Sequence, residues 1–418
     1  MNVFNINKIK NFTAVDLICW VLVFIFFSFP ISLALANLLI AIFLVLFLLK
    51  KKYFNIIWAL KSNPFASTAL ALYVWILVGI FYSNANWAEI TLHLGKYYKL
   101  LLIFIVASSM TVAIWRKRAW IAFSTAMLFT LASTYGNIWW QLPWSRTQNT
   151  GWGNDHTVIK DYISQGLMMA MFSLALLSQA IDKSNKIILR FIFAFTAGLA
   201  LISITHLSNG KTGYLAAVCV ILAFAVFSAN GKYRPFIFLI TIILGSLIYL
   251  SSTSLQARVN GAIQDARNHS ITDFSSTGQR LYFANKTWAL IKEKPILGWG
   301  TGSYHQQFCK VADNDAWCQA GKHHPHNQIL FIWMEHGIIG ALLLMALIFA
   351  PLIHVWNRTG PKAVLMAGFT GLFLVGSVTH GSLWLSTENH FFTLIGALIA
   401  SAAWPAKETV HAKVQETI

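Results

Sequence analysis

The feature that most constrains this chain is a series of apolar segments, each close to the length of a membrane-spanning helix. Such a helix needs about 20 mostly apolar residues. Hydrophobic residues make up 57% of the 418-residue chain and charged residues only 11%, whereas soluble domains hold about 25% charged residues. Twelve segments are predicted to span a membrane: 14–29, 31–49, 66–82, 98–115, 119–140, 161–181, 187–207, 212–229, 235–251, 326–356, 363–384 and 389–404. The predicted fold is therefore an all-α, polytopic transmembrane helical bundle.

One long hydrophilic loop divides the predicted spans. Spans one to nine fall in residues 1–251, the loop in 252–325, spans ten to twelve in 326–404, and a cytoplasmic tail in 405–418. The loop is predicted to be partly helical, because two of its segments place apolar residues at helical spacing with charges between them.

The two predicted loop helices cover residues 254–268 and a segment from Gly278 to Pro295, since proline cannot continue a helix. The second is expected to lie along the membrane interface by an apolar stripe. The members of this stripe are Leu281, Ala284, Trp288 and Ile291. The glycine-rich segment 298–304 is predicted to form a tight turn that lets the backbone approach a ligand or another helix.

The basic residues indicate orientation in a membrane and exclude nucleic acid as an expected partner. The formal net charge is +17, but 18 of the 31 Lys and Arg residues lie in or beside alternate loops. Five lie in the opposite short loops, and the other eight lie in the long loop, which the positive-inside rule does not count. The rule places both termini in the cytoplasm and the long loop outside.

A histidine-rich stretch opens the tenth predicted span. Pro325 fits the first turn of a helix, so His326 is expected at the helix N-terminus, on the face of Gly337 and Gly340. A Gly-x-x-Gly pair lets another helix pack closely, so His326 is predicted to point into the bundle at its outer end. The positive end of the helix dipole attracts anions and disfavours imidazolium, which would keep His326 neutral and able to accept a proton.

Two basic residues are expected on the same side as His326. Lys211 lies in a short turn between the seventh and eighth spans, and Arg280 opens the second loop helix. Together they could bind a pyrophosphate, with Arg280 as the bidentate partner. Attraction to lipid phosphates is the alternative for each. Arg146 and Lys160 lie in the other long outer segment. They are candidates for a binding role, and the alternative for each is a role as an interfacial anchor.

The loop cysteines offer a disulfide or a metal site. Cys309 and Cys318 lie on the side where oxidation is permitted, so a disulfide is a candidate. With His323, His324 and His326 they also supply the ligand types of zinc. Their spacing matches no closed zinc pattern and the cluster holds no carboxylate, so no metal site is predicted.

Three segments in this order resemble a known family. His326-Asn327, followed after nine residues by Gly-x-x-Gly, resembles a signature shared by O-antigen ligases, O-antigen polymerases and pilin-type oligosaccharyltransferases. Residues 277–304 resemble the family's loop segment, in which an Arg opens a helix and a glycine-rich turn follows. The stretch "GKTGYL" resembles a turn that usually carries Arg; here Lys211 keeps the charge but lacks the bidentate fork. The resemblance covers residues 190–345.

The resemblance implies about twelve transmembrane helices in the bacterial inner membrane, with a periplasmic loop between spans nine and ten. It implies a metal-independent, inverting glycosyl transfer without cofactor from a polysaccharide on undecaprenyl pyrophosphate, and for a ligase the acceptor is a sugar hydroxyl of lipid A–core. His326 would be the base or acceptor-orienting group, and Arg280 and Lys211 would bind the leaving pyrophosphate. Candidate substrate-binding residues are Arg146, Lys160, His324, Asn327 and His380.

Two alternatives stay open. The donor motifs do not separate a ligase from an O-antigen polymerase or a protein O-oligosaccharyltransferase, although the single long loop and the short segment after the last span favour a ligase. Twelve spans are also typical of transporters and flippases. The charges in the outer loop, and the expected lack of paired ionisable groups inside the spans, favour an enzyme over a transporter.

Overall fold

The computed structural model describes residues 14–49, 62–228, 233–253, 256–257, 260–261 and 276–404, and all regular elements in these ranges are helices. The prediction of an all-α fold is confirmed for this part of the chain. Its helices are α1 (Ala14–Ile31), α2 (Leu33–Leu49), α4 (Pro64–Val78), α5 (Trp87–Tyr97), α6 (Lys99–Ser109), α7 (Ala113–Gly136), α8 (Tyr162–Ile181), α9 (Ile187–His206), α10 (Lys211–Phe227), α11 (Arg234–Ser251), α13 (Ser276–Glu293), α14 (Tyr304–Val311), α15 (Asp315–Gly321), α16 (Gln328–Val355), α17 (Pro361–Thr379) and α18 (Ser386–Ala403).

Length and apolar composition make the chain a multi-pass membrane protein. Five stretches of the described residues are long and apolar enough to cross a membrane: Trp87–Ser109, Tyr162–Ile181, Ile187–His206, Gln328–Val355 and Pro361–Thr379. Four apolar helices are shorter: Val15–Ile31, Leu33–Leu49, Pro64–Val78 and Lys211–Phe227. The number of twelve spans stays a prediction.

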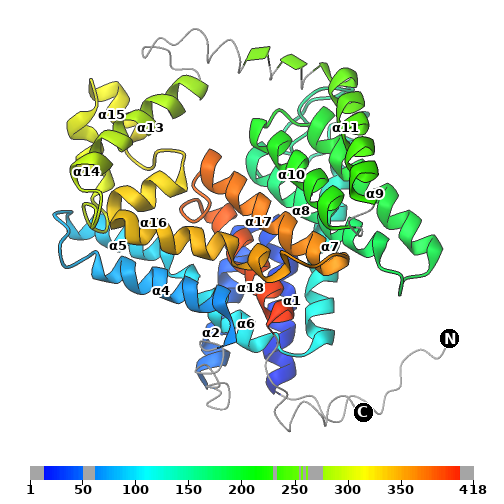
Figure 1. The fold of residues 1–418 in the computed structure, drawn as a ribbon, viewed down its shortest axis with the longest axis horizontal. Coiled ribbons are helices and arrows are strands. Elements are labelled where there is room, and N and C mark those ends of the chain that lie inside the picture. The colour runs from blue at the N-terminus through cyan, green and yellow to red at the C-terminus, as the bar shows by residue number, and fades with distance from the viewer. Residues whose placement is uncertain are drawn as a thin grey trace.

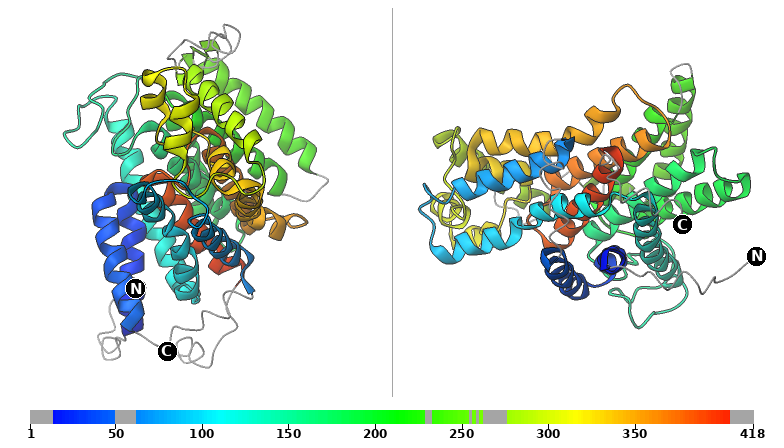
Figure 2. Two further views of the ribbon diagram at one scale, coloured as in Figure 1. Left: turned by 90° about the vertical axis from the view of Figure 1, so that its left-hand side faces the viewer. Right: turned by 90° about the horizontal axis from the view of Figure 1, so that it is seen from below.

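The central helices α17 and α18 lie between two groups (Figures 1 and 2). On one flank α16 runs beside α4 and α5, with α13, α14 and α15 above them in Figure 1; on the other flank lie α8 to α11. Glycines allow close crossings in the core. A Cβ on Gly166 of α8 would lie 3.0 Å from the Cα of Gly213 in α10, so these two helices approach each other through their backbones.

The bounds of the predicted span 98–115 are wrong. The preceding α5 was not predicted, because Glu89, His93 and Lys96 lower its hydropathy. It joins α6 at Tyr98, and the chain bends after α6 before α7 begins at Ala113. The basic run 116–118 therefore lies in the first turns of α7 rather than in a loop, and the Arg116 guanidinium donates to backbone carbonyls in the bend.

Helix ends meet at two opposite ends of the bundle. At one end, the Gly360 N–H donates to the Phe227 carbonyl (2.7 Å), which joins the start of α17 to the end of α10. At the other end, the Gln328 N–H donates to the His380 carbonyl (3.1 Å), which joins the start of α16 to the end of α17. The starts of α8, α10 and α18 also lie at this second end, as the contacts described below show.

Helix α13 agrees with the predicted second loop helix within two residues at each end. Its predicted apolar stripe coincides with the buried face only at Ile291, however. Leu281 and Trp288 are each 42% exposed, while Tyr282, Phe283 and Leu290 pack against the core together with Ile291. An interfacial position for α13 stays a prediction. The first predicted loop helix lies largely outside the described residues, and the tail 405–418 lies wholly outside them.

The glycine-rich turn after α13 docks on a break in α16. Trp299 and Gly300 donate their N–H groups to the carbonyls of Met334 and Glu335 (3.0 and 2.8 Å), and the Ile338 N–H donates back to Pro295 (2.9 Å). The break occurs at Gly337, whose φ is 63°.

The prediction that Gly337 and Gly340 let another helix pack closely is therefore wrong for Gly337. A Cβ at Gly337 would collide with the carbonyl of Ile296 in the docked turn, and its φ lies in the left-handed region that favours glycine. At Gly340 a Cβ would meet the side chains of His336 and Ile332 within the same helix.

Replacement of Gly337 by alanine is expected to destabilise the protein by about 2 kcal/mol or more, since the residue would be forced into the left-handed region against the turn. Thermal unfolding of the detergent-purified protein, followed by tryptophan fluorescence, measures the effect. Gly198→Ala in α9 is the matched control, because no atom lies within 4 Å of a Cβ at that position. Equal unfolding temperatures for the two variants would contradict the docking role.

Candidate functional site

His326 lies outside α16, contrary to the prediction that it occupies the helix N-terminus. The helix begins at Gln328, and Asn327 is its N-cap: its side-chain oxygen accepts the N–H groups of Ile329 and Leu330, both at 3.0 Å. Asparagine at this position satisfies two backbone donors that a helix leaves free. His326 stands before the cap with φ 53°, and its N–H donates to His324 Nδ1 (3.1 Å).

Three histidines gather before α16 and after α17. The ring centroids of His324 and His326 are 4.3 Å apart, and those of His326 and His380 are 5.5 Å apart. The His326 ring also stacks on Phe283 of α13, with centroids 5.9 Å apart and an interplanar angle of 14°. Residues from the loop helix and from two bundle helices therefore fix one imidazole. His323, by contrast, is exposed.

Two of these imidazoles are neutral at ordinary pH. Burial is the main cause that lowers the pKa of His326 to about 4, and the electrostatic interactions with His380 and Arg280 act in the same direction. Burial lowers the pKa of His324 to about 2, with His326, His380, His323 and Lys96 acting in the same direction. The predicted neutrality agrees with these directions, but its main cause is burial rather than a helix dipole.

A carboxylate that is not among the predicted site residues completes the cluster. Glu388, in the first turn of α18, is 3% exposed and its Oε1 lies 3.3 Å from His380 Nδ1. The same oxygen lies 2.8 Å from the hydroxyl of Ser164, which is 2.6 Å from the carboxylate of Asp161, the N-cap of α8. A polar chain thus links the starts of α8 and α18 to His380. The sequence signal was the acidic residue that follows His380 by eight positions.

The predicted cations converge from two other helices. Lys211, at the start of α10, donates to the Thr277 hydroxyl of α13 (2.9 Å). Arg280 lies one turn further along α13, where burial lowers the pKa of its guanidinium while the nearby Tyr162 opposes the shift. Since the charge of Arg280 acts on His326, both cations lie at the end of the bundle that holds the histidines. This arrangement suits an anion beside a neutral imidazole.

Of the candidate residues Lys160 and Arg146, only one lies near the histidine cluster. Lys160 lies beside the cluster: burial lowers the pKa of its ammonium, and the charges of Asp161 and Glu388 act in the opposite direction. The side chain of Arg146 is exposed, and its recorded hydrogen bond runs through the backbone N–H to Val158. The described contacts therefore bring Lys160, but not Arg146, to the histidines.

The expectation that the spans hold no paired ionisable groups is wrong. Glu335 in α16 is fully buried, and one of its oxygens lies 3.0 Å from His93 Nδ1 of α5. The other oxygen accepts the Tyr304 N–H at the start of α14 (3.0 Å). This pair was missed because α5 itself was not predicted. Its contacts hold α5, α14 and α16 together.

Cys309 and Cys318 form a disulfide between α14 and α15. His305 lies beside it, and the three side chains bring their potential ligand atoms within 4.8 Å of one another. The disulfide removes both thiolates as ligands, so the donor set does not fit a zinc ion in this state.

The site is that of a multi-pass membrane protein in which buried neutral histidines face cations across the ends of several helices. Residues 195–345, which hold Lys211, Arg280 and His326, match the family model described as O-antigen ligase. His380 and Glu388 lie outside that range. The segment that carries the predicted motifs is therefore similar to the O-antigen ligase family.

Curated relatives agree with this assignment. The chain is 24% identical over 254 residues to a putative polysaccharide ligase of Rickettsia conorii, which covers 54% of this chain and 58% of that protein. A putative polysaccharide ligase of Rickettsia felis is 26% identical over 46% of this chain and 54% of its own length. An O-antigen ligase of Salmonella typhimurium is 30% identical over 26% of this chain and 30% of its own length. The chain thus aligns with little more than half of the first two relatives.

Removal of the Arg280 charge is expected to raise the pKa of His326 above about 4, because that charge disfavours imidazolium. The pKa should stay below its ordinary value, since burial is the larger cause. Histidine-selective NMR of the Arg280→Gln variant across pH 3–7 measures the change. Lys292→Gln, an exposed position on the same helix, is the control; an equal shift there would show that Arg280 has no specific effect.

Proposed function

We propose that this chain is a glycosyltransferase of the O-antigen ligase type. It transfers a polysaccharide from undecaprenyl pyrophosphate to a sugar hydroxyl of lipid A–core, in the inner membrane and on its periplasmic face. The observation that carries the proposal is the neutral His326 between the cationic end of α13 and the His380–Glu388 pair. The family match over residues 195–345 supports the same reaction class.

In the proposed reaction, the acceptor hydroxyl oxygen attacks the anomeric carbon of the donor sugar. The bond from this carbon to the pyrophosphate oxygen breaks, and the configuration inverts. The electron pair leaves with the pyrophosphate, which Arg280 and Lys211 bind through charge-assisted hydrogen bonds. His326 accepts the hydroxyl proton. The pyrophosphate is a good leaving group, so no nucleotide or metal is required in this scheme.

The low pKa of His326 fits this scheme because the donor itself would change it. In the free protein the Arg280 charge and burial make the imidazole a weak base. A bound pyrophosphate would compensate the charge of Arg280 and add negative charge near the ring, and both effects raise the pKa of the imidazole. His326 would thus become a better base once the donor is in place.

His380 and Glu388 are proposed to position the site rather than to carry the transferred proton. Glu388 lies 3.3 Å from His380 and accepts from the Ser164 hydroxyl, so it orients the imidazole that packs against His326. His324 and Asn327 set the backbone on either side of His326. Lys160 is proposed to contribute to substrate binding, and for Arg146 no described contact supports that role.

The proposed topology has twelve spans, with both termini in the cytoplasm. It divides the chain at residues 1–251, 252–325, 326–404 and 405–418, as the sequence predicts. The gathering of the site at one end of the bundle supports it, because these helix ends fall on the predicted outer side. O-antigen polymerase and protein O-oligosaccharyltransferase activities share this donor, and an assay with each acceptor separates them.

His326→Ala is expected to reduce transfer by about 10²–10⁴-fold, the usual contribution of a general base, while the protein remains in the membrane. Purified protein, lipid-linked polysaccharide and lipid A–core are combined, and the modified core is quantified by gel mobility. His323→Ala, which removes an exposed neighbouring imidazole, should keep most of the activity. Wild-type-like transfer by His326→Ala would refute the role of this residue.

Chelation is expected to leave transfer unchanged, because the proposed chemistry needs only the cations of Arg280 and Lys211 at the pyrophosphate. The same assay is run after dialysis against a strong chelator, with and without added zinc or magnesium. Loss of transfer on dialysis, followed by recovery on addition of one metal, would contradict the metal-independent mechanism.

A further inference from the structure

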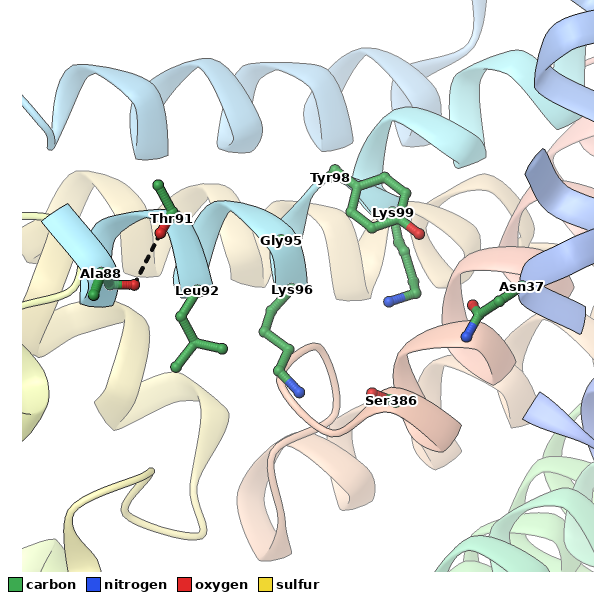
Figure 3. Close-up of a pocket in the computed structure, with 9 residues that line it drawn as sticks. All are labelled: Asn37, Ala88, Thr91, Leu92, Gly95, Lys96, Tyr98, Lys99 and Ser386. Atoms are coloured by element: carbon green, nitrogen blue, oxygen red, sulfur yellow. Dashed lines mark hydrogen bonds between the residues drawn. The ribbon is translucent and has the colours of Figure 1, made fainter. Parts of the chain in front are cut away.

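A second group of cations lies near the start of α18. A cavity of about 600 Å³ opens where α5 meets α6, opposite Asn37 of α2 and Ser386 at the start of α18 (Figure 3). Lys96, in the last turn of α5, and Lys99, the first residue of α6, extend their ammonium groups into it. None of the described residues that line the cavity is acidic.

The two lysines make this cavity selective for anions. Lys99 is only 4% exposed, and its ammonium lies 5.0 Å from the centroid of the Tyr98 ring. The Lys96 ammonium lies 5.6 Å from the centroid of the Trp384 ring. Aromatic faces attract cations but do not neutralise them. Two positive charges that share a partly buried space repel each other, and an entering anion would relieve that cost.

The cavity lies beside the segment that joins His380 to Glu388. Ser386 of this segment lines the cavity, and the Lys96 ammonium lies 5.6 Å from the ring of Trp384 in the same segment. The charge of Lys96 acts on His324, whereas that of Arg280 acts on His326. The two cationic sites therefore act on different members of the histidine cluster.

We infer that this cavity is the acceptor subsite and that it binds a phosphate group carried by the acceptor saccharide. This inference rests on the proposed function, which assigns the donor pyrophosphate to Arg280 and Lys211 and leaves the second cationic site for the other substrate. Lys96 and Lys99 bind the phosphate, and Ser386 at the rim is placed to meet a sugar hydroxyl. The acceptor saccharide then extends toward His324 and His326.

A phospholipid headgroup is the other source of the same chemistry, and the burial of Lys99 argues against it. Lysines that meet headgroups project from helix ends toward the interface and keep their ammonium groups in water. Lys99 instead has its side chain enclosed between α5, α6 and α18.

The test compares lipid A–core with the same acceptor after phosphatase treatment. In transfer assays with the full chain, the wild type should show a KM for the native acceptor about tenfold below that for the treated one, as expected for one charge-assisted hydrogen bond. Lys96→Gln should remove this difference and leave the donor KM unchanged, and Lys96→Arg, which keeps the charge, should restore it. Lys117→Gln, exposed on α7, is the control.

A second measurement keeps the inference testable without transfer. Binding of native and phosphatase-treated lipid A–core to the immobilised protein is measured without donor, in the presence of phosphatidylglycerol or inorganic phosphate. Preferential binding of the native acceptor, abolished by Lys96→Gln and by Lys99→Gln, would support the subsite. If the wild type bound the native acceptor in this way but transferred nothing, only the proposed function would be refuted. The subsite would be refuted if both acceptors bound equally well or if phosphatidylglycerol competed fully. It would also be refuted if Lys96→Gln changed only the donor KM.

Discussion

The docking of the glycine-rich turn on the break in α16 is the contact on which the site depends. Arg280 belongs to the loop and His326 to the approach to α16, and no regular helix connects them. The hydrogen bonds from Trp299 and Gly300 to the α16 carbonyls fix the end of α13 to the helix that His326 precedes. The Phe283 ring of α13 then stacks on the His326 ring and so connects the helix of Arg280 to this imidazole.

Much of the fold could be predicted from the sequence, because hydropathy reports directly on a membrane environment. Four of the five long spans and α13 were found within about five residues, and Lys211 and Arg280 were expected at the end of the bundle where they lie. Helix α5 was missed because one of its faces carries polar residues that are partly buried, and these residues lower its hydropathy. Its pairing with Glu335 is a tertiary feature that no local pattern contains.

The local errors around His326 have one cause. Proline often occupies the first turn of a helix, so the sequence placed His326 inside α16, but Asn327 is the stronger N-cap and its side chain begins the helix two residues later. His326 is left with a positive φ, which is uncommon for residues other than glycine and occurs where the surroundings hold the backbone. Likewise, Gly337 was assigned to helix packing because a sequence does not show that a distant turn will occupy its position.

Under the proposed function, the two cationic sites would make the protonation of the histidine cluster depend on both substrates. In the free protein, burial and neighbouring positive charge keep His324 and His326 neutral but weakly basic. An anion at Arg280 would act mainly on His326, and an anion at Lys96 mainly on His324, because each cation acts on a different ring. Since the rings are 4.3 Å apart, each anion would also stabilise a proton on the other ring. Under the proposed function, the base would then be strongest when donor and acceptor are bound together, and this would limit attack by water on a donor bound alone.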